Sequence, residues 1–279
     1  NHEDLGVSIP RAEVLEKLGL RSALMLPIFV GQKVVAVLEF FSRSNKAPDG
    51  EIRELMTEAG AQLGHSIERA MAERVIKDHA RSMETLQRLA LTVNETKTVE
   101  EVLPKCLEII CTDYGWEVGH VCNRDQLDSL KATSSPFWYL ADEAAFDCFR
   151  TAEVGSNSRG GVGLIGRAVA TGQIEIVPDV RDLKRFMRLR PANQSGLVGA
   201  CVAPISIDGD VVAVLEFFTT KRLENDFALE KFLTQVGTLL GRSFERMRAR
   251  EALLGAKNEA EAASEAKSQF LANMIHEIR

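Results

Sequence analysis

The sequence predicts an α+β fold class, with antiparallel sheets flanked by helices and joined by long signalling helices that end in a coiled coil. Three observations predict it: an internal repeat, a strand hairpin in each copy, and long stretches with the three- and four-residue spacing of helices. Residues 34–41 recur unchanged as residues 211–218. The same shift relates Gly60 and Gly64 to Gly237 and Gly241. Residues 1–70 therefore repeat the end of a longer unit, residues 98–246.

The longer unit can be justified element by element. Thr98 and Glu101 have the spacing of a capping box, which opens a helix through about Cys111. Asp208 and Gly209 form a strong turn signal between two apolar runs, and a long helix follows. Strands are expected over 116–123, 131–140, 174–177, 200–207 and 210–219, and short helices over 141–152, 167–171 and 183–190. A meander of strands with helices at both ends predicts a layered α+β domain.

Two other stretches predict long helices. Over residues 49–93 apolar side chains recur at helical spacing without a proline. Near the end, the alternating four- and three-residue spacing of a coiled-coil seam runs through Ala249, Leu253, Ala256, Ala260, Ala263, Lys267, Phe270 and Met274. We expect a homodimer through these helical linkers, and the alternative is a solvated helix rich in Ala and Glu.

Composition excludes several classes of protein. Hydrophobic residues make up 45% and charged residues 27%, which is typical of a folded globular chain. The net charge of −6 disfavours a nucleic-acid surface, and no apolar run reaches the roughly 18 residues of a membrane span. Five scattered cysteines without a CxxC pair fit a reducing compartment. We expect a cytoplasmic protein, cut from a longer chain, with no nucleic-acid partner and no membrane segment in this part.

Some candidate catalytic groups have a simpler interpretation. Glu39 and Glu216 occupy equivalent strands, and we interpret each as an acid on an exposed face or strand end. The glycine-rich residues 160–166 lack the Lys-Ser/Thr pair of a phosphate-binding loop. His2, His65, His79 and His120 show no metal-ligand spacing to one another, so no metal site is expected.

His276 differs from the other histidines in its predicted position on a helix. If Phe270 is placed at 0° on a helical wheel, the large apolar residues Leu271, Met274, Ile275 and Ile278 fall between 40° and 140°, and His276 falls at about 240°. It is therefore predicted to face solvent on an amphipathic helix. Imidazole, with an ordinary pKa near 6.5, retains a lone pair at neutral pH and can act as a nucleophile.

The repeat resembles a GAF domain, a module that binds small molecules and relays signals. The resembling residues are Trp116 to Gly119, Gly163 to Arg167, Thr171 and Gly172, Pro178 to Val180, Gly196 and Leu197, Pro204, and residues 211–218. The resemblance covers residues 98–246 fully and 1–70 in part. A ligand is expected between the sheet and residues 137–178, with Trp138, Phe146, Phe149 and Ile165 as candidate lining residues.

The end of the chain resembles the phosphoacceptor box of sensor histidine kinases. In that box Phe270 to Met274 precede His276, Glu277, Ile278 and Arg279; Ile275 replaces the usual serine. The resemblance implies that His276 is the phosphoacceptor and Glu277 the acid/base. It also implies ATP and Mg²⁺ in a catalytic domain outside this chain, a response-regulator receiver domain as partner, and no activity of the fragment alone.

The predicted organisation has four parts. They are the C-terminal half of a first GAF domain (1–70), a helical linker (71–97), a second GAF domain (98–246), and a coiled coil that begins the dimerisation domain (247–279). The parent is expected to pass phosphate from His276 to a response-regulator aspartate. One alternative is a non-catalytic GAF module that binds a ligand and relays a signal. Another is a photoreceptor, but Cys122 and Cys148 lack the following histidine usual where this family attaches a bilin, so no bilin is expected.

Overall fold

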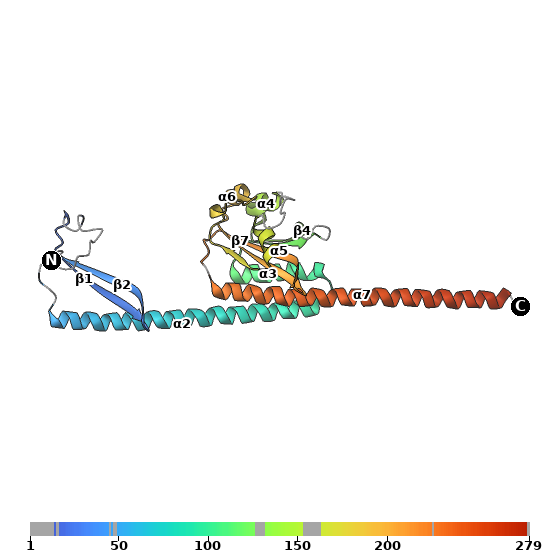
Figure 1. Cartoon of the computed structure of the whole chain (residues 1–279), viewed down its shortest axis with the longest axis horizontal. Helices are drawn as coiled ribbons and strands as arrows, with labels where there is room; N and C mark the ends of the chain where they lie inside the picture. The colour runs from blue at the N-terminus through green and yellow to red at the C-terminus, as the bar shows by residue number, and fades with distance from the viewer. Residues whose placement is uncertain are drawn as a thin grey trace. The chain divides into compact units, whose positions relative to one another are not determined.

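The computed structural model describes residues 14, 17–44, 46, 49–125, 132–152, 163–224 and 226–277 (Figure 1). Of residues 266, 267 and 269–277 it describes the backbone alone. The chain divides into two compact units, residues 1–78 and 79–279, and helix α2 (Gly50–Glu95) contributes to both. Within the described ranges, no helix combines the length and the apolar character that crossing a bilayer requires.

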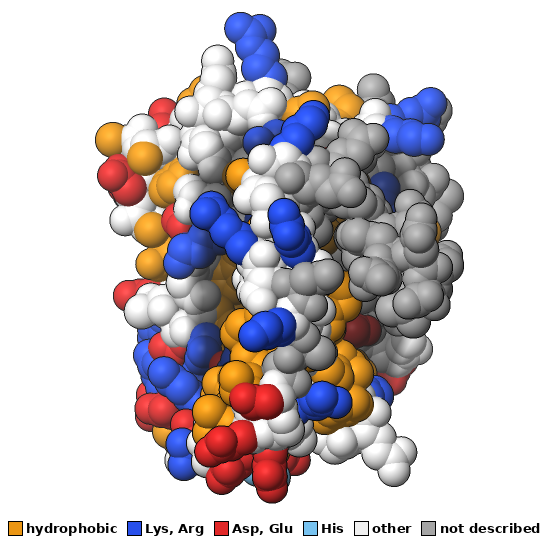
Figure 2. Space-filling model, turned by 90° about the vertical axis from the view of Figure 1, so that its left-hand side faces the viewer, with side chains coloured by type: hydrophobic (Ala, Val, Ile, Leu, Met, Phe, Trp, Pro, Cys, Tyr) orange, Lys and Arg blue, Asp and Glu red, His pale blue; other side chains and the backbone are white. Residues whose placement is uncertain are grey.

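The first unit contains an antiparallel hairpin and the beginning of α2. Strand β1 (Ser22–Val30) pairs with β2 (Lys33–Ser42) through a tight turn, where Gly31 takes a φ of 58° that glycine adopts without steric cost. Figure 2 shows hydrophobic side chains at the surface between charged ones, viewed from this end of the chain. The exposed hydrophobic residues of the hairpin are Met25, Phe29, Val34, Val35, Val37, Phe40 and Phe41. Glu39 is exposed on the same hairpin, as predicted.

The second unit has the α+β architecture that the repeat predicted. Its elements are α3 (Val99–Tyr114), β3 (Val118–Arg124), β4 (Ala132–Leu140), α4 (Glu143–Thr151), α5 (Gly163–Thr171), β5 (Glu175–Val177), η1 (Val180–Asp182), α6 (Leu189–Gln194), β6 (Gly199–Ile207), β7 (Asp210–Thr219) and α7 (Phe227–Glu277). The described strands form one antiparallel sheet in the order β4-β3-β7-β6-β5. The predicted helix cap at Thr98 is confirmed, because the Glu101 amide donates to the Thr98 hydroxyl; the Glu101 carboxylate accepts from the Lys97 amide instead of the Thr98 amide that a capping box uses.

The sheet separates two hydrophobic cores, as the layers in Figure 1 show. Helices α3 and α7 and the end of α2 cover one face, with Leu89, Leu107, Ile110, Phe232 and Leu240 fully buried. The opposite face is covered by α4, α5, η1 and α6, whose buried residues include Phe149, Ile165, Val180 and Ala192. Long helices therefore occupy one face, and short elements joined by loops occupy the other.

One predicted helix is wrong in its bounds. The sequence predicted a helix over 183–190, but the structure has the short η1 before Leu183 and begins α6 only at Leu189. Pro191 is compatible with the observed start. It has no amide hydrogen to donate, so it is tolerated in the first turn of a helix and disrupts an interior position. A start at Leu189 places Pro191 in that first turn.

Glycines allow α7 to approach the sheet closely. A Cβ atom on Gly237 would lie 2.5 Å from the Pro204 carbonyl oxygen, and one on Gly241 would overlap the Ser206 carbonyl oxygen. Gly64 has the same role in the first unit, since a Cβ there would overlap the Phe29 carbonyl oxygen, whereas Gly60 faces the Leu26 side chain. The repeat therefore preserves a contact between a helix and a strand backbone, in addition to an apolar pattern.

This contact predicts opposite effects for two substitutions in α7. Gly241→Ala should lower the free energy of unfolding by about 2 kcal/mol, because the added methyl forces backbone atoms apart. Gly255→Ala is the matched control, since no heavy atom lies within 4 Å of its added Cβ, and it should raise stability by up to about 1 kcal/mol. Urea unfolding followed by circular dichroism measures both. Equal effects would show that the close approach does not constrain α7.

Candidate functional site

A buried polar cluster lies on the loop-covered face of the sheet. Alternation along β3 and β7 points His120 and Glu216 to this face, and antiparallel pairing places them directly opposite each other. Both side chains have 0% exposure. A carboxylate and an imidazole in an apolar core need hydrogen-bonding partners, because an unpaired buried charge is very costly.

Arg188 supplies the counter-charge for Glu216. Its Nη2 donates to both carboxylate oxygens, at 2.6 Å to Oε1 and 2.8 Å to Oε2. Burial opposes ionisation of Glu216, but the Arg188 guanidinium and the hydrogen bond from His120 outweigh it and hold the pKa of Glu216 at about 2. Glu216 is therefore an anion at neutral pH, within a buried ion pair.

His120 extends the cluster to β4. Its Nδ1 lies 2.9 Å from Glu216 Oε2, and a carboxylate can only accept, so Nδ1 carries a proton. Nε2 lies 3.0 Å from the Ser134 hydroxyl and 3.3 Å from the Ser135 carbonyl oxygen. In the neutral ring the Ser134 hydroxyl donates to Nε2, which satisfies both nitrogens. Trp138 stacks on the imidazole with a centroid separation of 3.6 Å.

Arg188 itself is held between aromatic rings. It lies directly before α6, with its guanidinium 4.6 Å from the Phe149 ring centroid and 5.1 Å from that of Phe218. These distances are within the range of cation–π attraction. Only 4% of the side chain is exposed, and Nη1 has no hydrogen-bond partner in the described part of the chain.

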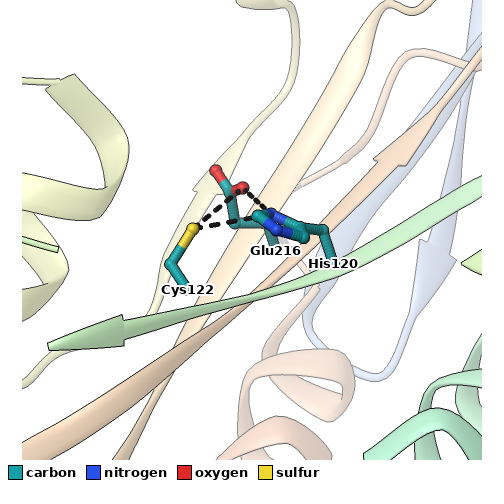
Figure 3. A group of neighbouring side chains, drawn as sticks. All are labelled: His120, Cys122 and Glu216. Carbon is teal, nitrogen blue, oxygen red and sulfur yellow. Dashed lines mark hydrogen bonds and ion pairs between the residues drawn. The ribbon is translucent and has the colours of Figure 1, made fainter. Parts of the chain in front are cut away.

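Cys122 is the third member of the group in Figure 3, which shows its sulfur directed toward Glu216 and His120. The sulfur lies 3.6 Å from Glu216 Oε2 and 3.5 Å from His120 Nδ1. One donor atom from each residue lies within 4.8 Å of the other two, a spacing that could hold a metal ion. Burial, reinforced by the charge of Glu216, raises the pKa of the Cys122 thiol well above its ordinary value, so it is protonated at neutral pH.

Charge balance argues against a divalent metal at these three residues. Zn²⁺ would be neutralised by a Cys122 thiolate and Glu216, which would leave the buried Arg188 cation without a counter-charge. The present pairing of Arg188 with Glu216 is neutral. The absence of a metal therefore remains a prediction for this site.

The interpretation of Glu216 as a solvent-facing acid is wrong. Its equivalent in the repeat, Glu39, is exposed, but Glu216 is buried because the second unit has β3 beside β7 and the α4–α6 elements above them. Sequence reasoning also missed His120 and Arg188. One signal was present: an acid and a histidine, each in the middle of an apolar strand, are the residues expected to pair in a buried core.

The structure places the predicted ligand residues around this cluster. Phe146, Phe149 and Ile165 belong to the hydrophobic core of the same face, and Trp138 packs against it. Their role in binding stays a prediction. The backbone of α7 runs through His276 and ends at Glu277. The side chains of His276 and Glu277, and residues Ile278 and Arg279, lie outside what the structure describes.

Comparison with known proteins assigns residues 96–245 to a family model described as GAF domain. No curated protein matches the chain. Similar solved structures include a free methionine-R-sulfoxide reductase of Neisseria meningitidis in complex with its substrate. It has a TM-score of 0.50 and 19% identity, and the match covers 61% of this chain and 91% of that one.

A second similar structure is the GAF domain of a phosphoenolpyruvate-protein phosphotransferase from Coxiella burnetii. Its TM-score is 0.50 at 14% identity, with 62% of this chain and 98% of that one covered. At these identities the likeness establishes the shared fold and transfers no activity. The α+β fold class predicted from the sequence is thereby confirmed.

The buried ion pair predicts how stability depends on pH. Because folding lowers the pKa of Glu216 to about 2, its contribution is complete above about pH 5 and is lost as the pH falls toward 2. The loss is on the order of 3 kcal/mol. Glu216→Gln should reduce this acid sensitivity and lower stability at pH 7 by roughly 3 kcal/mol, because Arg188 is left buried without a counter-charge.

Urea unfolding at several pH values between 2.5 and about 7 measures this effect. Asp147→Asn is the control, since its half-exposed carboxylate pairs with Arg150 at the surface, and it should change stability by less than about 1 kcal/mol. An unchanged pH profile in Glu216→Gln would contradict the assigned ionisation.

Proposed function

Because the chain belongs to the GAF domain family, we propose that its second unit is the signal-receiving module of a two-component sensor histidine kinase. The parent protein autophosphorylates His276 from ATP and Mg²⁺ and passes the phosphoryl group to a response-regulator aspartate. Glu277 is the neighbouring acid/base. The observation that carries this proposal is the continuity of α7, which begins against the GAF sheet and ends as the run that resembles a phosphoacceptor box.

The two parts of α7 have different surroundings. From Leu229 to Met247 its apolar residues belong to the core beneath the sheet, and they include Phe232, Val236 and Phe244. From residue 248 to 265 every side chain is exposed, including Leu253 at 72%. A helix of this length with no packed face gains little stability from its own propensity. The exposed part of α7 therefore needs another surface to pack against. A change at the sheet would be transmitted along this helix.

We propose that this packing partner is a second copy of the chain. The first five positions of the predicted seam, Ala249 to Ala263, fall in the exposed part of α7, and parallel pairing would bury its apolar positions. α2 also exposes apolar residues, among them Leu55, Val75, Ile76 and Met83. A homodimer paired through its helices is the arrangement in which two phosphoacceptor helices lie side by side.

The loop-covered face of the GAF sheet is the proposed signal-binding region. Its aromatic residues surround the polar cluster of His120, Arg188 and Glu216. A bilin attached through cysteine is not proposed. Burial raises the pKa of Cys106 to about 12 and those of Cys111, Cys122 and Cys201 further, so these thiols are poor nucleophiles. Cys148 is exposed but lacks the following histidine.

The phosphoacceptor role predicts the outcome of a labelling experiment. The full-length parent, incubated with radioactive ATP and Mg²⁺, should acquire an acid-labile phosphoryl label. His276→Gln should abolish it, because no other residue is proposed to supply the attacking nitrogen. Glu277→Gln should slow labelling by about 10²-fold or more, as expected for loss of a general acid/base.

His65→Gln is the matched control, because His65 is also a helix histidine and its side chain is 83% exposed. It should label like the unmodified protein. A wild-type parent that binds ATP but takes up no label would favour the alternative of a non-catalytic GAF relay. Label that persists in His276→Gln would refute the assignment of the phosphoacceptor.

The coil proposal predicts that helical phase matters more than length. Seven residues inserted between Leu253 and Ala263 keep the heptad seam in register, so regulated phosphorylation should persist. Three or four inserted residues turn His276 by roughly 60° or 40° and interrupt the heptads. These variants should be either active or inactive whether or not the signal is present. Phosphorylation assays of the parent with and without its signal measure this, and equal regulation in all three variants would mean that the coil is only a tether.

A further inference from the structure

Strand β2 of the first unit exposes apolar side chains that the second unit buries. Residues 34–41 of β2 have the same sequence as residues 211–218 of β7. Val37 and Phe41 are 50% and 39% exposed, although their equivalents in β7 have 0% exposure. Phe40, on the opposite face of the strand, is 41% exposed, and its equivalent is also buried. Since the side chains are identical, the difference arises from what covers the two strands.

The backbone edge of β2 differs from that of β7 in the same way. β7 pairs with β6 on one side and with β3 on the other. In the described part of the first unit, the sheet consists of β1 and β2 alone. The positions of β2 equivalent to those that pair with β3 are Ala36 to Phe41. An unpaired edge that is apolar and free of proline is a template for another strand.

We propose that the unpaired edge of β2 binds a protein strand from outside residues 1–279, which carries a basic side chain directly opposite Glu39. Glu39 supplies the specificity, because it lies between Val37 and Phe41 on the face that the partner would cover. In the second unit the equivalent Glu216 is hydrogen-bonded to His120, which lies directly opposite it on β3. A strand that covered Glu39 without a cation would bury an unpaired carboxylate, which is very costly.

A second copy of β2 fits this edge poorly. In antiparallel self-pairing, only one register brings Lys33 opposite Glu39, and it places the phenylalanines of residues 40–41 opposite the turn at residues 31–32. Both aromatic rings would then stay uncovered. A register with Arg43 opposite Glu39 pairs only the end of the strand, because β2 stops before Arg43, and leaves its middle uncovered. The positions of the charges therefore favour a different strand as partner.

Strand β3 shows which properties the partner needs. Its buried residues Val118 to Cys122 lie opposite the positions of β7 that correspond to Phe41 to Val37. They are apolar or small on both faces of the strand, apart from His120. The partner strand is therefore about as long as β3, apolar on both faces, and basic at the one position opposite Glu39.

The experiment uses the full chain and a synthetic peptide with the sequence of residues 116–124, which contains β3. The peptide carries a fluorophore at its N-terminus, and fluorescence anisotropy measures its binding. β7, which shares the sequence of β2, is already paired with its own β3 in the folded second unit. We therefore expect one peptide to bind per chain, at β2.

Charge reversal locates the site. In the peptide, His120→Glu places an acid opposite Glu39 and should weaken binding about tenfold or more, whereas His120→Arg should bind at least as tightly as the unmodified peptide. Glu39→Lys in the chain should reverse this preference, and it is tolerated because Glu39 is exposed. Glu58→Lys is the matched control, since it changes the charge of an exposed residue of α2 by the same amount and should leave the preference unchanged.

Two results would overturn the proposal. One is that none of the three peptides binds, and the other is a preference among them that Glu39→Lys does not reverse. If no peptide binds and the chain forms a dimer that Phe41→Asp dissociates in sedimentation experiments, the edge belongs to a second copy instead. Peptide binding needs no phosphoryl transfer, so it is independent of the labelling expected at His276.

Discussion

The second unit depends on how one negative charge is kept in its core. Glu216 lies in the interior of β7, among apolar residues, and an isolated carboxylate there would be strongly destabilising. Arg188 and His120 stabilise this charge by hydrogen bonding to it. Arg188 lies directly before α6, which covers the sheet, and His120 lies in the neighbouring strand β3. The loop-covered face is thus held to the sheet through a charged contact in addition to apolar packing. If one partner alone is replaced, a remaining charged group stays buried without its counter-charge, which is strongly destabilising.

This contact also relates the two faces of the sheet. β7 carries Glu216 toward the loop-covered face and Leu215 and Phe217 into the core covered by α2, α3 and α7. A change in the pairing of Arg188 therefore acts on a strand that also contributes to the core containing α7. Signal transfer in the proposed kinase requires a ligand that favours one of two such arrangements over the other. The structure supplies the residues through which that preference could act.

Much of the fold could be predicted from the sequence because its signals are local. The turn at Asp208 and Gly209, the helix cap at Thr98 and the helical spacing in α7 each depend on neighbouring residues. The polar cluster could not be predicted in this way. His120, Arg188 and Glu216 are far apart in the chain and meet only when β3 and β7 pair and α6 covers them.

The glycine contact of α7 has a consequence for the direction in which the rest of the helix faces. Gly241 meets the sheet backbone without a side chain, so rotating α7 about its own axis would bring Thr238 or Arg242 against a carbonyl oxygen. The azimuth of the helix is therefore determined at this point. Because α7 is continuous, this azimuth also determines the direction in which the exposed residues Leu253 and Ala260 face.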